Sequence, residues 1–143
     1  MPTGRNIPSA PPGALAQAIA ASQDAVGSLP PYTLLAQKRQ RLTSQEGTSG
    51  TGVASVSLQP PAGSNAYLVG IIHVSSDSTT ASAVSVQVDG DEVDFTAAGN
   101  QDVAYEQPPI WVGAGSVISV NWSNLSTKAQ VTASLQYQVV SAP

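Results

Sequence analysis

The stretch of sequence that decides the fold is VTASLQYQV, residues 131–139. Its apolar residues stand at every second position and are separated by Thr, Ser and Gln. Successive side chains of a β-strand point to opposite faces, so this alternation gives the segment one apolar and one polar face. We therefore predict a strand of an antiparallel sheet, with one face on a core and the other toward solvent.

Further short runs with strand patterns precede this stretch, at residues 53–58, 67–74, 84–88, 93–95, 110–112 and 117–122. Turn sequences separate them. Asp89-Gly90 predicts a tight hairpin, and Pro108-Pro109 marks another break. Short strands between such turns are typical of sandwiches, jelly rolls and small barrels. We predict an all-β fold, an antiparallel, jelly-roll-like β-sandwich that occupies residues 53–143.

Residues 1–31 differ in composition, and we interpret them as an extended N-terminal arm. Four prolines within the first twelve residues favour extended backbone and remove hydrogen-bond donors. The alanine-rich segment at about 14–26 predicts one short α-helix that ends at Gly27. Its apolar stripe is narrow, so the helix needs a surface on which to lie.

Residues 32–52 form a transition between the arm and the sandwich. Residues 32–42 are compatible with either a short helix or a first strand, because their periodicity favours neither. Residues 47–52, GTSGTG, have the composition of a flexible hinge.

Charge is distributed unevenly along the chain. Residues 1–42 carry a net charge of +3 and residues 43–143 a net charge of −7, which together give the formal net charge of −4. Only 10% of residues are charged, against roughly 25% in typical soluble domains. This composition is common both in proteins that pack against neighbouring subunits and in all-β extracellular modules, so composition alone does not choose between them. We predict that the partner-binding residues are Arg5, Ile7, Leu15, Ile19, Lys38, Arg39 and Arg41.

The chain offers few residues for catalysis or metal binding. It has no cysteine, and its one histidine, His73, lies in an apolar run, where we expect a strand histidine hydrogen-bonded within or beside the core. The acidic segment 89–94 fits a hairpin tip with solvated charges better than a calcium site. No acid stands out as half of a glycosidase pair. We predict no catalytic, cofactor or metal residues, and no enzymatic activity.

Five aromatic residues are candidates for core packing or for ligand binding. Tyr67, Trp122 and Tyr137 fall within alternating strand runs, so we predict that they pack in the core or an interface. Tyr105 and Trp111 flank Pro108-Pro109 and are the candidates for an exposed ligand surface. They support a second hypothesis, a carbohydrate- or receptor-binding module.

Nucleic acid and membranes are not expected partners. The three cations at 38–41 have no interleaved aromatic residues and belong to an acidic chain, which is a weak footprint for nucleic acid. No run approaches the roughly 18 apolar residues of a membrane span, and the first residues lack the apolar core of a signal peptide. We expect synthesis in a host cytoplasm.

The run PPIWVGAGSVI, residues 108–118, is similar to strand-turn-strand segments in jelly-roll domains of phage decoration, head-fibre and tail-tip proteins. Together with the arm, the hinge and the cysteine-free sandwich, it resembles the small virion proteins of tailed bacteriophages. The resemblance implies a structural role in the virion, as a capsid decoration or cement protein or an appendage anchor. It further implies a homo-oligomer, with a trimer favoured, and binding to the major capsid protein or other virion subunits. It implies no catalytic residues.

Overall fold

The computed structural model describes residues 33–47, 52–63 and 65–141. These residues form eight β-strands: β1 (Thr33–Gln45), β2 (Ala54–Leu58), β3 (Asn65–Ser76), β4 (Ala83–Val88), β5 (Asp91–Thr96), β6 (Gln101–Val112), β7 (Ile118–Ser123) and β8 (Gln130–Ser141). The predicted arm, with its helix at about 14–26, lies outside the described residues. No helix in the part of the chain that the structure describes is long and apolar enough to cross a membrane.

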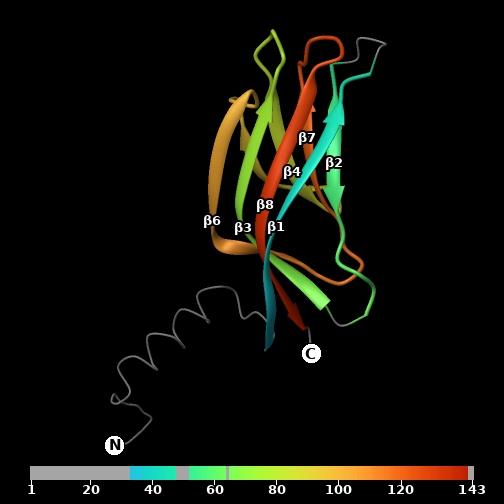
Figure 1. Cartoon of the computed structure of the whole chain (residues 1–143), viewed down its shortest axis with the longest axis vertical. Coiled ribbons are helices and arrows are strands. Elements are labelled where there is room, and N and C mark those ends of the chain that lie inside the picture. Colours follow the sequence, from blue (N-terminus) through green and yellow to red (C-terminus); the bar gives the residue numbers. More distant parts are fainter. Residues whose placement is uncertain (1–32, 48–51, 64, 142–143) are drawn as a thin grey trace, which may run out of the picture. The chain divides into compact units, whose positions relative to one another are not determined.

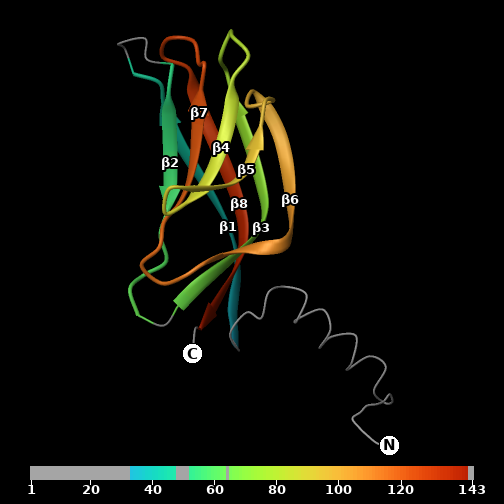
Figure 2. The same cartoon turned by 180° about the vertical axis from the view of Figure 1, so that it is seen from behind.

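The strands form two four-stranded antiparallel sheets, which confirms the predicted all-β class. The first sheet has the order β1-β8-β3-β6 and the second the order β2-β7-β4-β5. In the two views of Figures 1 and 2 the sheets lie face to face. The first strand in the chain pairs with the last, the second with the second-last, and so on: β1 with β8, β2 with β7, β3 with β6 and β4 with β5. Such a folded-over hairpin is the topology of a jelly roll.

The core lies between the sheets and is built as the alternation in residues 131–139 predicts. Val131, Ala133, Leu135 and Tyr137 are buried in it, and Val139 packs against it. Burying a Val or Leu side chain contributes about 1.5–3 kcal/mol to the stability of the fold. Trp122 is only 1% exposed, and its indole Nε1 donates to the carbonyl of Gly99 at 3.1 Å. The predicted core positions of Trp122 and Tyr137 are thus confirmed.

The open alternative at residues 32–42 resolves to a strand. β1 pairs with β8 from Thr33 to Gln45 and forms the outer strand of the first sheet. Tyr137 of β8 donates its hydroxyl to Gln40 Oε1 of β1 at 2.9 Å, and its ring centroid lies 4.5 Å from that of Tyr67. The sandwich that the structure describes therefore includes residues of the predicted transition.

β6 starts earlier than predicted, at Gln101 rather than at residue 110. Pro108-Pro109 was interpreted as a break, and the structure corrects this. Because β6 is an outer strand, residues without a backbone donor are tolerated on its free edge. Residues 106–109 stand opposite Gly70 alone, and the bond between Gln107 and Pro108 is cis. The strand bends sharply there (Figure 1).

Two polar side chains, Glu46 and Asn100, hold the loops at one end of the sandwich by hydrogen bonds. Glu46 is 2% exposed, and its carboxylate accepts from the amides of Gly52 and Lys128, both at 2.8 Å. Asn100 Oδ1 accepts from the amide and the hydroxyl of Ser82, at 2.9 and 2.6 Å. These contacts satisfy loop amides that regular strand pairing leaves free.

The predicted hairpin at Asp89-Gly90 is confirmed. Both residues have positive φ, 51° and 89°, as a tight turn between twisted strands requires. Asp89 Oδ1 accepts from the amide of Val117 at 3.0 Å, so this carboxylate joins the hairpin to the start of β7.

Candidate functional site

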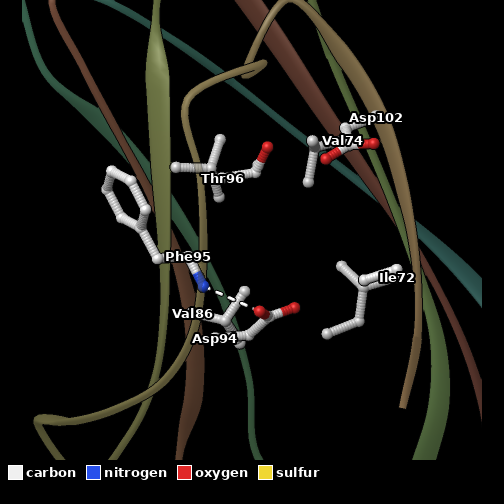
Figure 3. Close-up of a pocket in the computed structure, with 9 residues that line it drawn as sticks. Ile72, Val74, Val86, Asp94, Phe95, Thr96 and Asp102 are labelled. Carbon is white, nitrogen blue, oxygen red and sulfur yellow. Dashed lines mark hydrogen bonds between the residues drawn. The ribbon is translucent and has the colours of Figure 1, made fainter.

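The flank between β5 and β6 holds a cavity of about 160 Å³ between the two sheets. β5 is the outer strand of the second sheet and β6 that of the first, and the two lie beside each other (Figure 2). Asp94 and Thr96 of β5 stand opposite the core residues Val86 and Val84, so they face inward. Figure 3 shows the cavity with its lining residues. They are Ile72, Val74, Val84, Val86, Asp94, Phe95, Thr96, Asp102 and Ala104.

The polar side of this cavity is made of carboxylates with different environments. Asp102 accepts from the hydroxyl of Thr96 and from the amide of Val103, the latter at 2.9 Å, and both bonds lower its pKa. Asp94 Oδ1 accepts from the amide of Phe95 at 2.8 Å. The two bonds that Asp102 accepts favour its charged form.

The pKa of Glu106 on β6 is shifted in the opposite direction to that of Asp102. Its pKa is raised to about 7 by partial burial, by a hydrogen bond with Asp94 and by the negative charge of Asp94. A hydrogen bond between two carboxyl groups requires a proton on one of them. While Glu106 is protonated, its hydrogen bond with Asp94 therefore joins β5 to β6 across the flank.

This arrangement differs from the carboxylate pair of a glycoside hydrolase. Glycoside hydrolases keep their two carboxyl groups about 5–9.5 Å apart, whereas Asp94 and Glu106 are directly hydrogen-bonded. The cavity is also smaller than the roughly 300–1,000 Å³ of typical ligand pockets. Among the described residues, no three His, Asp or Glu side chains are grouped so that they could hold a metal ion.

The outer face of the first sheet brings several predicted residues together. A row across its four strands contains Arg39, Gln136, Ile71 and Tyr105. The next row contains Arg41, Ser134, His73 and Val103. Side chains from both rows line a shallow hollow of about 300 Å³ on this face. They are Arg39, Ile71, His73, Val103, Tyr105, Ser134 and Gln136.

His73 and the two predicted ligand-surface residues differ in their surroundings. His73 is a half-buried strand residue, but it faces the outer side of the sheet, and its imidazole forms no hydrogen bond with another described residue, so the predicted hydrogen-bonded histidine beside the core is not found. Tyr105 is 73% exposed, whereas Trp111 is half-buried on the other side of the bend in β6. Only Tyr105 of the predicted pair is therefore an open aromatic surface.

The predicted partner-binding residues fall into two groups. Lys38, Arg39 and Arg41 are exposed on β1. Within the part of the chain that the structure describes, none of these three cations forms an ion pair. Arg5, Ile7, Leu15 and Ile19 lie outside the described residues.

Sequence reasoning missed the pair of Asp94 and Glu106 as well as the buried carboxylate of Glu46. The alternation of Asp102, Ala104 and Glu106 on β6 was the available signal for the pair. It was hidden because the strand was expected to begin only after the two prolines.

Comparison with known proteins gives a likeness in fold. No protein-family model matches the chain, and no curated protein matches its sequence. A chain of the acidic stable capsid structure of Helicobacter pylori bacteriophage KHP30 is similar to it, with a TM-score of 0.50 and 12% sequence identity. The similarity covers 79% of this chain and 98% of that chain.

Two further solved structures have lower similarity. Dimeric latent PorU from Porphyromonas gingivalis has a TM-score of 0.32 and 8% identity, over 74% of this chain and 13% of that chain. The CBM36-1 domain of a multidomain xylanase from the hindgut metagenome of Trinervitermes trinervoides has a TM-score of 0.34 and 9% identity. That match covers 74% of this chain and 98% of the domain. The likeness to the phage capsid chain is thus one of fold, over nearly the whole length of that chain.

Proposed function

We propose that the protein is a non-enzymatic structural component of a virion, which decorates a phage capsid or anchors an appendage. The observation that carries this proposal is the fold likeness to the capsid chain of bacteriophage KHP30, over 98% of that chain. In this proposal the arm, residues 1–31, docks on the major capsid protein or another virion subunit. The sandwich forms a homo-oligomer, with a trimer favoured.

The surface of the sandwich supports an assembly role. Its outer strands have long free edges, which proteins usually cover or protect with charge. Clustering small domains around an axis buries such edges and multiplies weak contacts into avidity. The prolines of the predicted arm reduce the conformational entropy that it loses when it docks.

The test uses purified particles of the virus that encodes the chain. We expect mass spectrometry to find the chain in them, and we expect the full chain to bind particles that lack it. A chain without residues 1–31 should keep its β-sheet circular dichroism but fail to bind. Absence from purified particles would contradict the virion role, and full binding by the truncated chain would contradict docking through the arm.

The exposed ring of Tyr105 favours a second candidate, a carbohydrate- or receptor-binding module. It lies in the hollow with Arg39 and His73, and an exposed aromatic face can stack on a sugar ring. A glycan array tests this candidate with Tyr105→Ala and with Trp111→Ala as the comparison. Binding that only Tyr105→Ala abolishes would favour the module, and no binding across the array would count against it.

A further inference from the structure

Exposed apolar side chains concentrate on two opposite edges of the sandwich. Seven large apolar residues are exposed in the part of the chain that the structure describes. Leu34 and Leu35 belong to β1. Val93, Phe95, Val103 and Tyr105 belong to β5 and β6, and only Val53 lies elsewhere. β1 and β6 are the two outer strands of the first sheet, so the residues on β1 and those on β5 and β6 lie at its two opposite edges.

The same two edges carry opposite charges. The cations Lys38, Arg39 and Arg41 lie exposed on β1, and we call them the basic edge. The strands β5 and β6 carry five of the eight acidic residues of the described chain, and we call these five the acidic edge. They are Asp91, Glu92, Asp94, Asp102 and Glu106.

This separation of charge selects one way for two copies to meet. Two basic edges repel each other, and so do two acidic edges, which disfavours a two-fold contact between equal surfaces. A basic edge against an acidic edge is attractive and also covers the exposed apolar residues of both. From this complementarity we infer that the β1 edge of one copy docks head-to-tail against the β5–β6 edge of the next copy, closing a ring. The inference rests on the homo-oligomer of the proposed function and assigns its two surfaces.

The register of the first sheet places a cation and an exposed aromatic ring at the two ends of one row. Arg39 stands at the β1 end of a cross-strand row, and Tyr105 stands at the β6 end of the same row. If the row of one copy continues into the next, the guanidinium of Arg39 meets the exposed ring of Tyr105, which is a favourable cation–π geometry. Lys38 and Glu106 both face the other side of the sheet, the side opposite to Arg39 and Tyr105. They can therefore meet across the same contact.

The test measures the mass of the full chain in solution by light scattering, at low and high salt. The basic-edge reversal changes its three cations to Glu, and the acidic-edge reversal is Asp91→Lys with Glu92→Lys, two exposed positions outside the cavity. We expect wild type to form one discrete oligomer that weakens with salt, and each reversal to give single chains. The two reversals combined in one chain should restore the oligomer. Lys128→Glu, a reversal in the loop between β7 and β8 that meets β1 only at its last residue, Gln45, should leave it intact.

Circular dichroism of every variant shows whether it is folded, so loss of the oligomer is not confused with unfolding. A wild-type chain that stays single, an oligomer that survives both reversals, or a combined variant that stays single would overturn the inference. Particle binding is measured separately on the same proteins. A ring that does not bind particles would contradict the virion role alone, whereas single chains that do bind particles would contradict the ring alone.

Discussion

The carboxylate of Glu46, just after β1, accepts a hydrogen bond from the backbone amide of Lys128, 82 residues further along the chain. Its other oxygen accepts from the amide of Gly52. Gly52 and Lys128 both have positive φ, 72° and 63°. Gly52 lies before β2 and Lys128 lies in the turn before β8, so one buried side chain joins the segments that precede these two strands.

Replacing Glu46 with Ala should lower the free energy of unfolding by about 3 kcal/mol, because one buried and one part-buried hydrogen bond to backbone amides are lost. Glu46→Gln should cost less, since its carbonyl oxygen still accepts one of the two bonds. Urea denaturation measures both. Ser57→Ala, at an exposed position of β2, is the control and should change stability little. Equal stability of Glu46→Ala and this control would show that the two bonds contribute nothing.

Gly99 is required by packing rather than by its backbone conformation. A Cβ at this position would lie 2.7 Å from Ser82 Oγ and 3.0 Å from the Ser82 carbonyl. Gly99→Ala should therefore destabilise by about 1–3 kcal/mol, as overpacking in a filled site does. The shift should also strain the bond from Trp122 Nε1 to the Gly99 carbonyl.

Gly70→Ala is the control for this substitution. A Cβ on Gly70 meets no atom within 4 Å, so Ala should be neutral or slightly stabilising there. Thermal unfolding of the two variants side by side checks the difference. A Gly99→Ala protein that unfolds no earlier than Gly70→Ala would show that the close approach to Ser82 relaxes freely.

Local sequence patterns predicted the parts of the fold that local chemistry decides. The alternation in residues 131–139 predicted which face of β8 is buried, because one misplaced face would expose four core residues. Asp89-Gly90 predicted its hairpin, because few residue pairs accept two positive φ angles. Both signals depend on the segment alone and not on what packs against it.

The candidate site could not be predicted in this way, because it depends on irregular pairing. The apolar residues Val93 and Phe95 suggest that β5 buries them and exposes Asp94. A register shift in the pairing of β4 with β5 reverses this, so that Asp94 faces inward and Phe95 is 57% exposed. Glu106 faces inward by the regular alternation of Asp102, Ala104 and Glu106, but these residues precede the predicted start of the strand at residue 110.

Tyr137 ties the outer strand β1 to the sheet through its hydroxyl, which donates to Gln40 Oε1 at 2.9 Å. Tyr137→Phe keeps the ring and its contact with Tyr67 but loses this bond, so it should cost about 0.5–1.5 kcal/mol. A double-mutant cycle with Gln40→Ala isolates the bond by urea denaturation. A coupling energy of zero would mean that the two side chains act independently in solution.

The pair of Glu106 and Asp94 should make stability depend on pH in an unusual direction. Unfolding returns the pKa of Glu106 from about 7 to its ordinary value of 4.5. Between these values the unfolded chain binds fewer protons than the folded chain, so the free energy of unfolding falls as pH rises from about 4.5 to 7. Above pH 7 both states are deprotonated at Glu106 and the decline stops. Denaturation series across this pH range measure the slope.

Glu106→Gln should remove this slope, because its neutral amide can still hydrogen bond with Asp94 at every pH in the range. Asp102→Asn is the matched control on the same strand. The pKa of Asp102 is lowered from 3.8, so its contribution is present above that value and is lost as pH falls below it. Asn at 102 should therefore change only the acid limb and leave the slope between pH 4.5 and 7 in place. If Glu106→Gln keeps the wild-type slope, other titrating groups cause the slope, and the contact between β5 and β6 does not depend on the protonation of Glu106.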